Sequence, residues 1–367
     1  MPDTKKLHIL LAAGGSGGHL FPAMALAEEL MKDNHNVCIV TDHRGARFKG
    51  DSTPYPIEII NSATLEPGLI GKFKTAFKLG IGVLQSFKLI KSFKPDVVIG
   101  FGGYPAFPPV FTAQKLGIKT ILHEANAVLG KANKMLAKQA TKIALSLPTT
   151  LGVHDVSSNK DKAEVTGNPV RSEIIQKQGA TYKPFHGEET IRIFIMGGSQ
   201  GARTFSEIVP EAVALLPEHI QKRLHIIQQC RPEDLDDAQN RYAQTKAQIE
   251  LESFFNDVPE QFEKCHLFIG RSGASTVSEV AIIGRPAIFV PMYHADMQQK
   301  VNADVIADVG GAWVILQDGF TAEALSARLE TLFSLPQGLE AAAAKSASVG
   351  KPDATKNLAQ LVQKIAA

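Results

Sequence analysis

The sequence predicts an α/β protein of two domains, each with a doubly wound parallel sheet, facing one another across a cleft. Two glycine-rich turns, at residues 14–19 and 197–203, lie about half a chain apart. Each turn follows a short apolar run, at residues 7–13 and 191–196, and opens a segment with a helical pattern. Short, almost continuously apolar runs that end at glycine are typical of buried parallel strands. Each domain is therefore expected to be Rossmann-like.

The expected strands divide evenly between the two halves of the chain. In the first half they are residues 7–13, 36–41, 57–60, 96–100, 119–122 and 142–145. In the second half they are residues 191–196, 224–228, 249–253, 267–269, 287–290 and 312–315. Because longer helical patterns separate these runs, they indicate βαβ units. The polar stretch 152–163 and the turn formers at 167–171 mark the junction. We therefore expect domains at residues 1–165 and 166–351, with a ligand in the cleft.

Composition restricts the classes of function. A chain of 367 residues with 44% hydrophobic residues can bury a large core. A net charge of +2 does not favour nucleic-acid binding. Cys38, Cys230 and Cys265 are widely spaced and odd in number, which predicts no disulfide framework or zinc site and favours a reducing cytoplasm. Apolar runs are too short to span a membrane, so membrane contact is expected to be peripheral.

The glycine turns predict anion binding, because a helix start directs free backbone N–H groups at its ligand. His19 follows the first turn and is a candidate general base, since its imidazole titrates near neutral pH. Alternatively, its side chain only caps the turn. A third cluster, Gly102-Gly103-Tyr104, lies at another strand end. Its glycines would let a substrate approach the backbone, or they only form a tight turn before a helix.

A nicotinamide or flavin dinucleotide site is the main rival interpretation of the first turn. Its fingerprint is G-x-G-x-x-G, but Leu20 stands where the last glycine belongs. Asp42, after the second strand, could still serve as the acidic ribose-binding residue of such a site. A P-loop is not indicated, because neither turn is followed by Gly-Lys-Ser/Thr.

Two polar segments follow neighbouring strands of the second half, at residues 271–279 and 291–299. Glu279 in the first segment could accept hydrogen bonds from two vicinal ribose hydroxyls. It could also simply favour the helix dipole. Polar groups at successive strand ends of one sheet more often indicate a ligand site.

A series of short motifs runs along the chain: GGSGGH with Phe21-Pro22-Ala23, FGGY at 101–104, HEAN at 123–126, GNPVR at 167–171, GGSQGAR at 197–203, RSGASTVSE at 271–279 and PDAT at 352–355. In combination, these motifs resemble those of the MurG family. The resemblance covers nearly the whole chain. It implies the GT-B fold and inverting transfer of N-acetylglucosamine from UDP-N-acetylglucosamine to the muramyl 4-hydroxyl of undecaprenyl-diphospho-MurNAc-pentapeptide, which turns lipid I into lipid II.

The resemblance also implies roles for individual residues. His19 matches the proposed base. The implied donor-binding residues are Ser16, Gly17, Gly18, Asn126, Arg171, Ser199, Phe255, Ala274, Ser275, Thr276, Val277, Ser278, Glu279, Gln298 and Gln299. The implied acceptor-binding residues are Gly14, Gly15, Gly102, Gly103 and Tyr104, and the turn 16–18 is placed at the acceptor diphosphate as well. The C-terminal helix, residues 352–367, is expected to pack back on the first domain.

Three positions depart from the common family spelling. Ser16 replaces Thr, Ala125 replaces Gln, and Phe255 replaces a smaller aliphatic residue. Because alanine stands at position 125 in place of glutamine, a possible contact with the sugar is absent. We expect no metal ion and no cofactor, because helix N-termini and Arg171 could meet the charge on the departing UDP.

The segment 70–94 combines lysines with apolar residues and has no acidic residue. The predicted membrane residues are Phe73, Phe77, Ile81, Leu84, Lys72, Lys74 and Lys78. Each lysine near an anionic leaflet contributes about 1 kcal/mol. Alternatively, the helix packs its apolar stripe on the sheet. Leu79, Val83 and Ile90 form a second apolar face, which favours one side for the sheet and one for lipid.

The expected location is therefore the cytoplasmic face of the bacterial inner membrane, where other cell-wall and division proteins are possible partners. Two other functions stay open. A UDP-N-acetylglucosamine epimerase would share the donor site without needing a basic apolar helix. A non-catalytic sugar-nucleotide-binding scaffold would keep the glycine turns and tolerate loss of His19.

Overall fold

The computed structural model describes residues 6–48, 53–62, 68–153, 155, 162–198, 201–293 and 297–367, without the side chains of residues 47, 48, 69, 70, 72–74 and 76. The chain divides into two compact units. One consists of Met1–Arg171 and Asp353–Ala367, and the other of Ser172–Pro352. Among the expected site residues, Ser199 and the side chains of Lys72, Phe73 and Lys74 lie outside this description.

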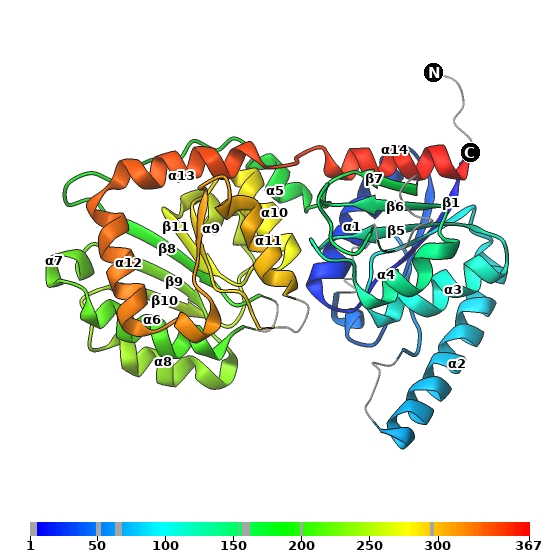
Figure 1. Ribbon diagram of the computed structural model, residues 1–367, viewed down its shortest axis with the longest axis horizontal. Helices are drawn as coiled ribbons and strands as arrows, with labels where there is room; N and C mark the ends of the chain where they lie inside the picture. Colours follow the sequence, from blue (N-terminus) through cyan, green and yellow to red (C-terminus); the bar gives the residue numbers. More distant parts are fainter. Residues whose placement is uncertain are drawn as a thin grey trace. The chain divides into compact units, whose positions relative to one another are not determined.

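The first unit contains a seven-stranded sheet in the order β3-β2-β1-β4-β5-β6-β7 (Figure 1). Its strands are β1 (His8–Ala12), β2 (Asn36–Thr41), β3 (Ile57–Ile59), β4 (Val97–Gly100), β5 (Lys119–Glu124), β6 (Lys142–Leu145) and β7 (Ala163–Val165). All neighbouring pairs are parallel. Because β1 lies between β2 and β4, the strand order reverses there, and the loops after β1 and β4 meet at the ligand-binding edge expected of such sheets.

The second unit repeats this arrangement with a six-stranded sheet in the order β10-β9-β8-β11-β12-β13. Its strands are β8 (Ile191–Met196), β9 (Leu224–Gln229), β10 (Gln248–Glu252), β11 (Leu267–Gly270), β12 (Ala287–Phe289) and β13 (Ala312–Val314). These pairs are also parallel. Its reversal lies between β8 and β11, so the second glycine turn occupies the position that the first turn occupies in its own sheet.

Helices cover both faces of each sheet. In the first unit they are α1 (Gly17–Lys32), α2 (Leu69–Phe93), α3 (Phe107–Lys115), α4 (Lys131–Leu136) and α14 (Ala354–Ala366). In the second unit they are α5 (Ser172–Gln176), α6 (Arg203–Leu215), α7 (Glu218–Gln221), α8 (Leu235–Tyr242), α9 (Val258–Lys264), α10 (Ala274–Ile283), α11 (Gln298–Ala307), α12 (Ala322–Ser334) and α13 (Pro336–Ser348). Short 3-10 turns include η1 (Gly45–Phe48), η2 (Tyr104–Ala106) and η6 (Gln317–Gly319).

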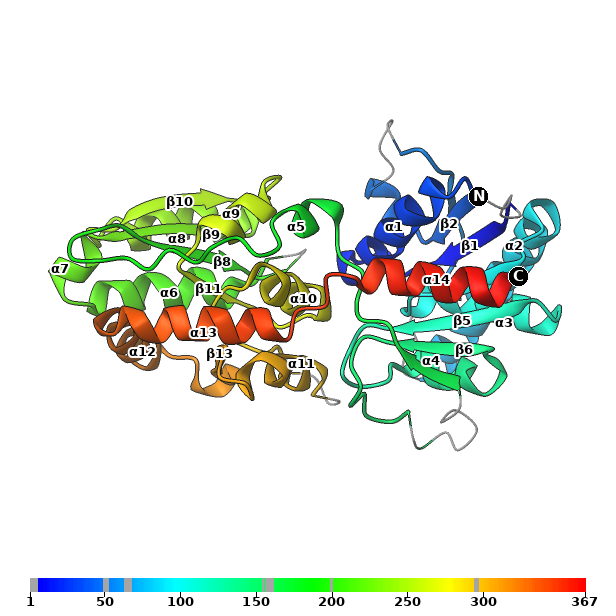
Figure 2. The same cartoon turned by 90° about the horizontal axis from the view of Figure 1, so that it is seen from above.

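The C-terminal helix α14 belongs to the first unit, where it lies beside α1 (Figure 2). Leu358 and Val362 of α14 are fully buried in the same apolar cluster as Leu26 and Leu30 of α1. Burial of such side chains stabilises the fold by about 1.5–3 kcal/mol each. The last helix therefore completes one face of the first sheet.

The predicted α/β fold with two parallel sheets is confirmed, and every expected strand is present with its ends shifted by at most about two residues. The prediction that the two halves of the chain contain equal numbers of strands was wrong, because the first sheet has an additional edge strand, β7. Its three residues lie within or next to the polar stretch interpreted as the junction, and Ala163 and Glu164 are half-buried while Val165 is exposed. Pairing with β6, rather than an apolar pattern, makes this segment a strand.

Candidate functional site

The first glycine turn and the turn after β4 are in direct contact. The Gly14 N–H donates to the Gly102 carbonyl oxygen over 3.1 Å. Gly102 and Gly103 have φ values of +82° and +75°, which favour glycine. A Cβ added at Gly103 would also lie only 3.1 Å from the Gly14 Cα. The two clusters that the sequence predicted separately therefore form one backbone surface.

His19 lies against this surface. A Cβ at Gly102 would be 3.2 Å from its Cε1 atom, and a Cβ at Gly103 would be 3.2 Å from its Cδ2 atom. The ring is half-buried, and its buried Nδ1 makes no hydrogen bond to any described residue. Burial lowers the pKa of His19, the Phe101 carbonyl opposes this shift, and the positive charge of Arg44 lowers the pKa further. The imidazole is consequently neutral at pH 7, as a general base must be.

Ser16 is the N-cap residue of α1, but its side chain does not cap the helix. Its backbone carbonyl accepts from the N–H groups of His19 and Leu20 instead, at 3.1 and 3.0 Å. Gly17, the first residue of the helix, precedes the residues that donate these bonds. The turn thus presents backbone donors and a hydroxyl, both suited to phosphate oxygens.

A buried carboxylate organises the loop after β5. Glu124 accepts from the Asn126 backbone N–H at 3.0 Å and from its Nδ2 at 3.2 Å. It also accepts from the Gly130 N–H at 2.8 Å and from Asn133 Nδ2 at 2.9 Å. Burial raises the pKa of Glu124, and these hydrogen bonds oppose the rise. In the sequence, Glu124 was only part of the HEAN motif and Asn133 was not singled out, although Glu124 fixes the position of Asn126 and Asn133 holds Glu124.

His123, the neighbour of Glu124, connects this loop to the GNPVR segment. Its Nε2 lies 3.3 Å from the Gly167 carbonyl oxygen, which can only accept, so Nε2 carries the proton. Burial lowers the pKa of His123 to about 4. At the end of the same segment, the Arg171 guanidinium lies over the Phe21 ring of α1, with Cζ 5.1 Å from the ring centroid. This cation–π contact holds Arg171 at the glycine-turn end of α1.

Asp42 has a different partner from the one that a dinucleotide site would need. Its side chain is buried, and Oδ2 accepts from both Nε and Nη2 of Arg44 at 2.8 Å. Its Oδ1 accepts from the Arg44 backbone N–H at 3.2 Å. Because Arg44 uses both oxygens, the structure does not support Asp42 as a ribose-binding residue.

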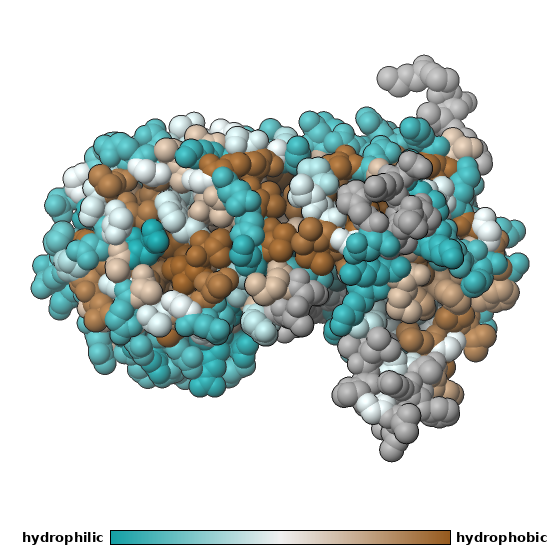
Figure 3. All heavy atoms as spheres, viewed as in Figure 1, coloured by the Kyte–Doolittle hydropathy of each residue, from teal (hydrophilic) through white to brown (hydrophobic). Residues whose placement is uncertain are grey.

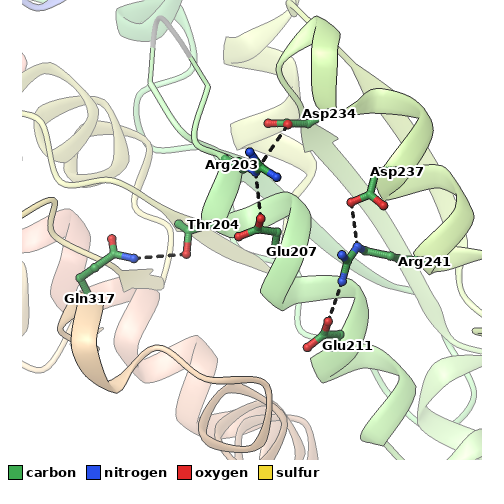
Figure 4. Close-up of polar contacts among 8 residues, drawn as sticks. All are labelled: Arg203, Thr204, Glu207, Glu211, Asp234, Asp237, Arg241 and Gln317. Atoms are coloured by element: carbon green, nitrogen blue, oxygen red, sulfur yellow. Dashed lines mark hydrogen bonds and ion pairs between the residues drawn. The ribbon is translucent and has the colours of Figure 1, made fainter.

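The second glycine turn is described except for residues 199 and 200. Gly198 and Gly201 have φ values of +87° and +69°, and the Gly201 N–H donates to the Gly198 carbonyl at 3.0 Å. Arg203 then begins α6 and shares its charge between Glu207 at 2.9 Å and Asp234 at 4.0 Å (Figure 4). Thr204, the next residue, accepts a hydrogen bond from Gln317 of η6, which fixes the helix start.

The expected ribose-binding segment forms the start of α10. Gly273 is its N-cap residue, so the backbone N–H groups of Ala274, Ser275 and Thr276 lie in the first turn. Glu279 follows in the second turn and is buried. The Val277 side chain is buried, and the Ser278 hydroxyl donates to the Ala274 carbonyl at 2.9 Å. The helix start therefore combines backbone donors with one carboxylate.

Gln298 and Gln299 are half-buried and open α11, and Gln299 connects three loops. Its Oε1 accepts from the Met292 N–H at 2.9 Å, and its carbonyl accepts from the Ser272 hydroxyl at 2.7 Å. Asn302 Nδ2 donates to the Ser272 carbonyl at 3.2 Å. These bonds fix Gln299 beside the start of α10. Because the Gln299 side chain uses its oxygen in this bond with the Met292 N–H, its amide N–H groups can still donate to a ligand.

Phe255 is buried, and its ring packs edge-on against Phe194 at 5.6 Å. A ligand would therefore meet the backbone of Phe255 rather than its side chain. Within the described ranges, no group of three or more His, Cys, Asp or Glu side chains could hold a metal ion.

Comparisons with known proteins find similarity over both units of the chain. The glycosyltransferase family 28 N-terminal domain matches residues 9–145, and the C-terminal domain of that family matches residues 192–358. The chain is 49% identical over 355 residues to the UDP-N-acetylglucosamine--N-acetylmuramyl-(pentapeptide) pyrophosphoryl-undecaprenol N-acetylglucosamine transferase of Rhodospirillum centenum, covering 96% of this chain and 93% of the relative. It is 43% identical to the transferase of the same name from Paramagnetospirillum magneticum, covering 98% and 97%.

A solved structure is also similar. The crystal structure of MurG from Acinetobacter baumannii superposes with a TM-score of 0.77 at 30% identity, covering 98% of this chain and 99% of that one. Both units, and not only one sheet, are therefore shared with this relative.

Proposed function

Because the chain belongs to the MurG family of glycosyltransferases, we propose that it transfers N-acetylglucosamine from UDP-N-acetylglucosamine to the muramyl 4-hydroxyl of undecaprenyl-diphospho-MurNAc-pentapeptide. This reaction converts lipid I to lipid II in peptidoglycan synthesis. The observation that carries the proposal is 49% identity over 96% of the chain to a transferase with that activity in its name.

The donor nucleotide is assigned to the second unit. The start of α10 offers backbone N–H groups for anionic oxygens, and the buried Glu279 suits ribose hydroxyls. Gln299 is already held by Met292 and Ser272, so its side chain needs little reordering on binding. The turn 197–201, which contains Ser199, is assigned to the donor diphosphate because the family resemblance implies it.

The acceptor is assigned to the joined turns of the first unit, with His19 as base. Neutral His19 takes the proton of the muramyl 4-hydroxyl as the oxygen attacks the anomeric carbon from the face opposite UDP. One displacement then inverts the α donor to a β product. Arg171, held over Phe21, and helix N-termini offset the charge that develops on the departing UDP. The reaction as proposed uses no metal ion or cofactor.

The lipid-linked acceptor requires a membrane surface, which we assign to α2. Phe77 and Leu84 are each 65% exposed, and Phe87 is exposed as well. The Nζ atom of Lys91 lies 5.6 Å from the centroid of the Phe87 ring. Figure 3 shows apolar surface where α2 and α3 lie. No helix of the described residues is long and apolar enough to cross a membrane. The proposal is thus peripheral binding to an anionic leaflet, at the cytoplasmic face of the inner membrane.

The opposite face of α2 packs on the protein. Ile90 is buried in the cluster between the helix and the first sheet, while Leu79 and Val83 are half-buried. Ile81, which the sequence predicted for the membrane face with Phe77 and Leu84, is also half-buried. One face of α2 therefore packs on the sheet and another is exposed for lipid. This supports the two-sided arrangement that the sequence predicted.

The proposal is tested by measuring UDP release from UDP-N-acetylglucosamine by the purified protein, with and without a lipid I analogue. Wild-type protein is compared with His19→Ala and with the exposed control Glu330→Gln. We expect release only with the analogue, together with a 10²- to 10⁴-fold lower rate in His19→Ala and unchanged donor binding. Donor turnover without acceptor would indicate an epimerase or hydrolase instead. Binding without turnover would indicate a scaffold.

A further inference from the structure

We propose that the Arg44 guanidinium binds the diphosphate of the lipid-linked acceptor at the first glycine turn. The inference rests on the proposed function and adds a charged residue to a site that otherwise consists of backbone N–H groups and a hydroxyl. It begins from the packing of the loop after β2 on that turn.

The loop carrying Arg44 is in close contact with Gly15. A Cβ added at Gly15 would lie 2.6 Å from the Gly45 backbone N and 2.8 Å from the Arg44 Cβ, and it would also meet Asp42. No side chain other than hydrogen fits there. The Cβ atom of Arg44 therefore lies directly beside the glycine turn. The side chain is long enough to reach a ligand bound at that turn.

Asp42 holds the Arg44 side chain in a defined orientation. The Asp42 side chain is 4% exposed, whereas that of Arg44 is 53% exposed. Nε and Nη2 of Arg44 both donate to Oδ2 of Asp42 at 2.8 Å, while Nη1 makes no hydrogen bond or ion pair among the described residues. Arginine presents its donors in a fixed planar fork, which suits phosphate oxygens. An arginine that is already ordered loses less conformational entropy on binding.

The positive charge of Arg44 also acts on His19, the proposed base. It disfavours protonation of His19, which contacts the same turn through Gly14. Other groups near His19 in the described part of the chain are the Phe101 carbonyl after β4, Asn133 of α4 and His123 of β5, and none of these three carries a positive charge at pH 7. Arg44 is therefore a cationic group whose charge acts on His19, and an acceptor diphosphate bound to it would lie next to the base.

Both substrates carry a diphosphate, so the test compares them. Initial rates are measured with a soluble lipid I analogue and with UDP-N-acetylglucosamine for wild type, Arg44→Gln and Arg44→Lys. The control is Arg241→Gln, because Arg241 also donates from Nε to an aspartate at 2.8 Å but lies on α8, on the second unit (Figure 4). The pH dependence of the rate and the midpoint of thermal unfolding are recorded for each variant.

We expect the KM for the acceptor to rise about 10- to 100-fold in Arg44→Gln, with the KM for the donor unchanged and partial recovery in Arg44→Lys. The acid limb of the pH profile should move to higher pH in Arg44→Gln and not in Arg44→Lys, because loss of the positive charge favours protonated His19. The preference of the enzyme for a diphosphate over a monophosphate acceptor analogue should fall in parallel.

A rise in the KM for the donor, or unchanged KM values for both substrates in a folded variant, would overturn the assignment of Arg44. If Arg44→Gln does not fold, the assignment is tested with Arg44→Lys alone. If Arg44→Lys and the wild type have equal KM values for the acceptor and an equal preference for the diphosphate, a fork-shaped contact is contradicted. Absence of transfer by the wild type with any acceptor would instead overturn the proposed function, so the two failures are distinguishable.

Discussion

The buried carboxylate of Glu124 holds Asn126 through two hydrogen bonds, one to its backbone N–H and one to its side-chain amide. Asn126 is implicated in donor binding by the motif in which it occurs, yet its orientation depends on Glu124. The polar contacts of this loop converge on Glu124, so the carboxylate acts as the organiser and Asn126 as the group presented to a ligand.

Glu124→Gln is expected to lower the free energy of unfolding by about 1–3 kcal/mol, because an amide replaces one acceptor oxygen with a donor that faces other donors. Transfer activity should fall as well, with the larger effect on the KM for the donor. Chemical denaturation and initial rates measure the two effects. Glu330→Gln on the exposed face of α12 is the control, and equal stability of Glu124→Gln and this control would contradict the organising role.

Gly15 and Gly18 provide a matched pair within one turn. Gly15→Ala should destabilise the protein by about 1–3 kcal/mol, because its Cβ would meet the loop after β2 at 2.6–2.8 Å. Gly18→Ala should be neutral or stabilise by up to about 1 kcal/mol, since nothing lies within 4 Å and alanine favours a helix. The free energy of unfolding in urea separates the two variants. Similar values for both would show that the loop moves away at little cost.

The pH dependence of transfer should reflect the lowered pKa of His19. The rate rises as His19 loses its proton, so the acid limb of kcat/KM is expected below pH 6.5, with a plateau from there to about pH 8. Rates measured from pH 5 to 9 test this, with His19→Ala as the control that should lack the limb. A limb centred above pH 7 would be incompatible with a neutral, half-buried imidazole in the free protein.

Stability should fall in mild acid because of His123. Its pKa is about 4 in the native protein and 6.5 in the unfolded chain, so the unfolded state binds more protons between these values. The free energy of unfolding therefore decreases as pH falls from 6.5 towards 4, by up to about 1.4 kcal/mol per pH unit for this residue. His123→Gln retains a donor for Gly167 and should reduce the difference in stability between pH 7 and pH 5. An unchanged difference would assign the acid sensitivity to other groups.

Vesicle binding should depend on the exposed apolar face of α2. The double variant Phe77→Asp plus Leu84→Asp should bind anionic vesicles at least about 10-fold more weakly, because it adds two negative charges and removes apolar burial. Leu335→Asp, which changes a leucine that is 63% exposed on the second unit, is the control. Co-sedimentation at low and physiological salt provides the measurement. Equal binding of all three proteins would remove α2 from the proposed membrane surface.

Local sequence patterns were sufficient for most of the fold and for part of the site. Apolar runs that end at glycine marked β1 and β8 correctly, because such strands are buried on both faces and need no particular partner to be recognised. β7 gave no such pattern, since an edge strand of three residues is defined by its hydrogen bonds to β6. Motif spelling predicted binding roles for Asn126 and Arg171, but it contained no sign of the contact between Arg171 and Phe21.

The sequence by itself determined the order of βαβ units, the two glycine turns and the residue types that suit a sugar-nucleotide site. Only the tertiary structure decided which of these groups meet. Gly14 contacts Gly102 because strand order reverses between β1 and β4 and brings two distant loops to one edge. The same packing lowers the pKa of His19 and encloses Glu124. Charge and hydrogen bonding depend on distances between residues far apart in the chain, and no local pattern contains those distances.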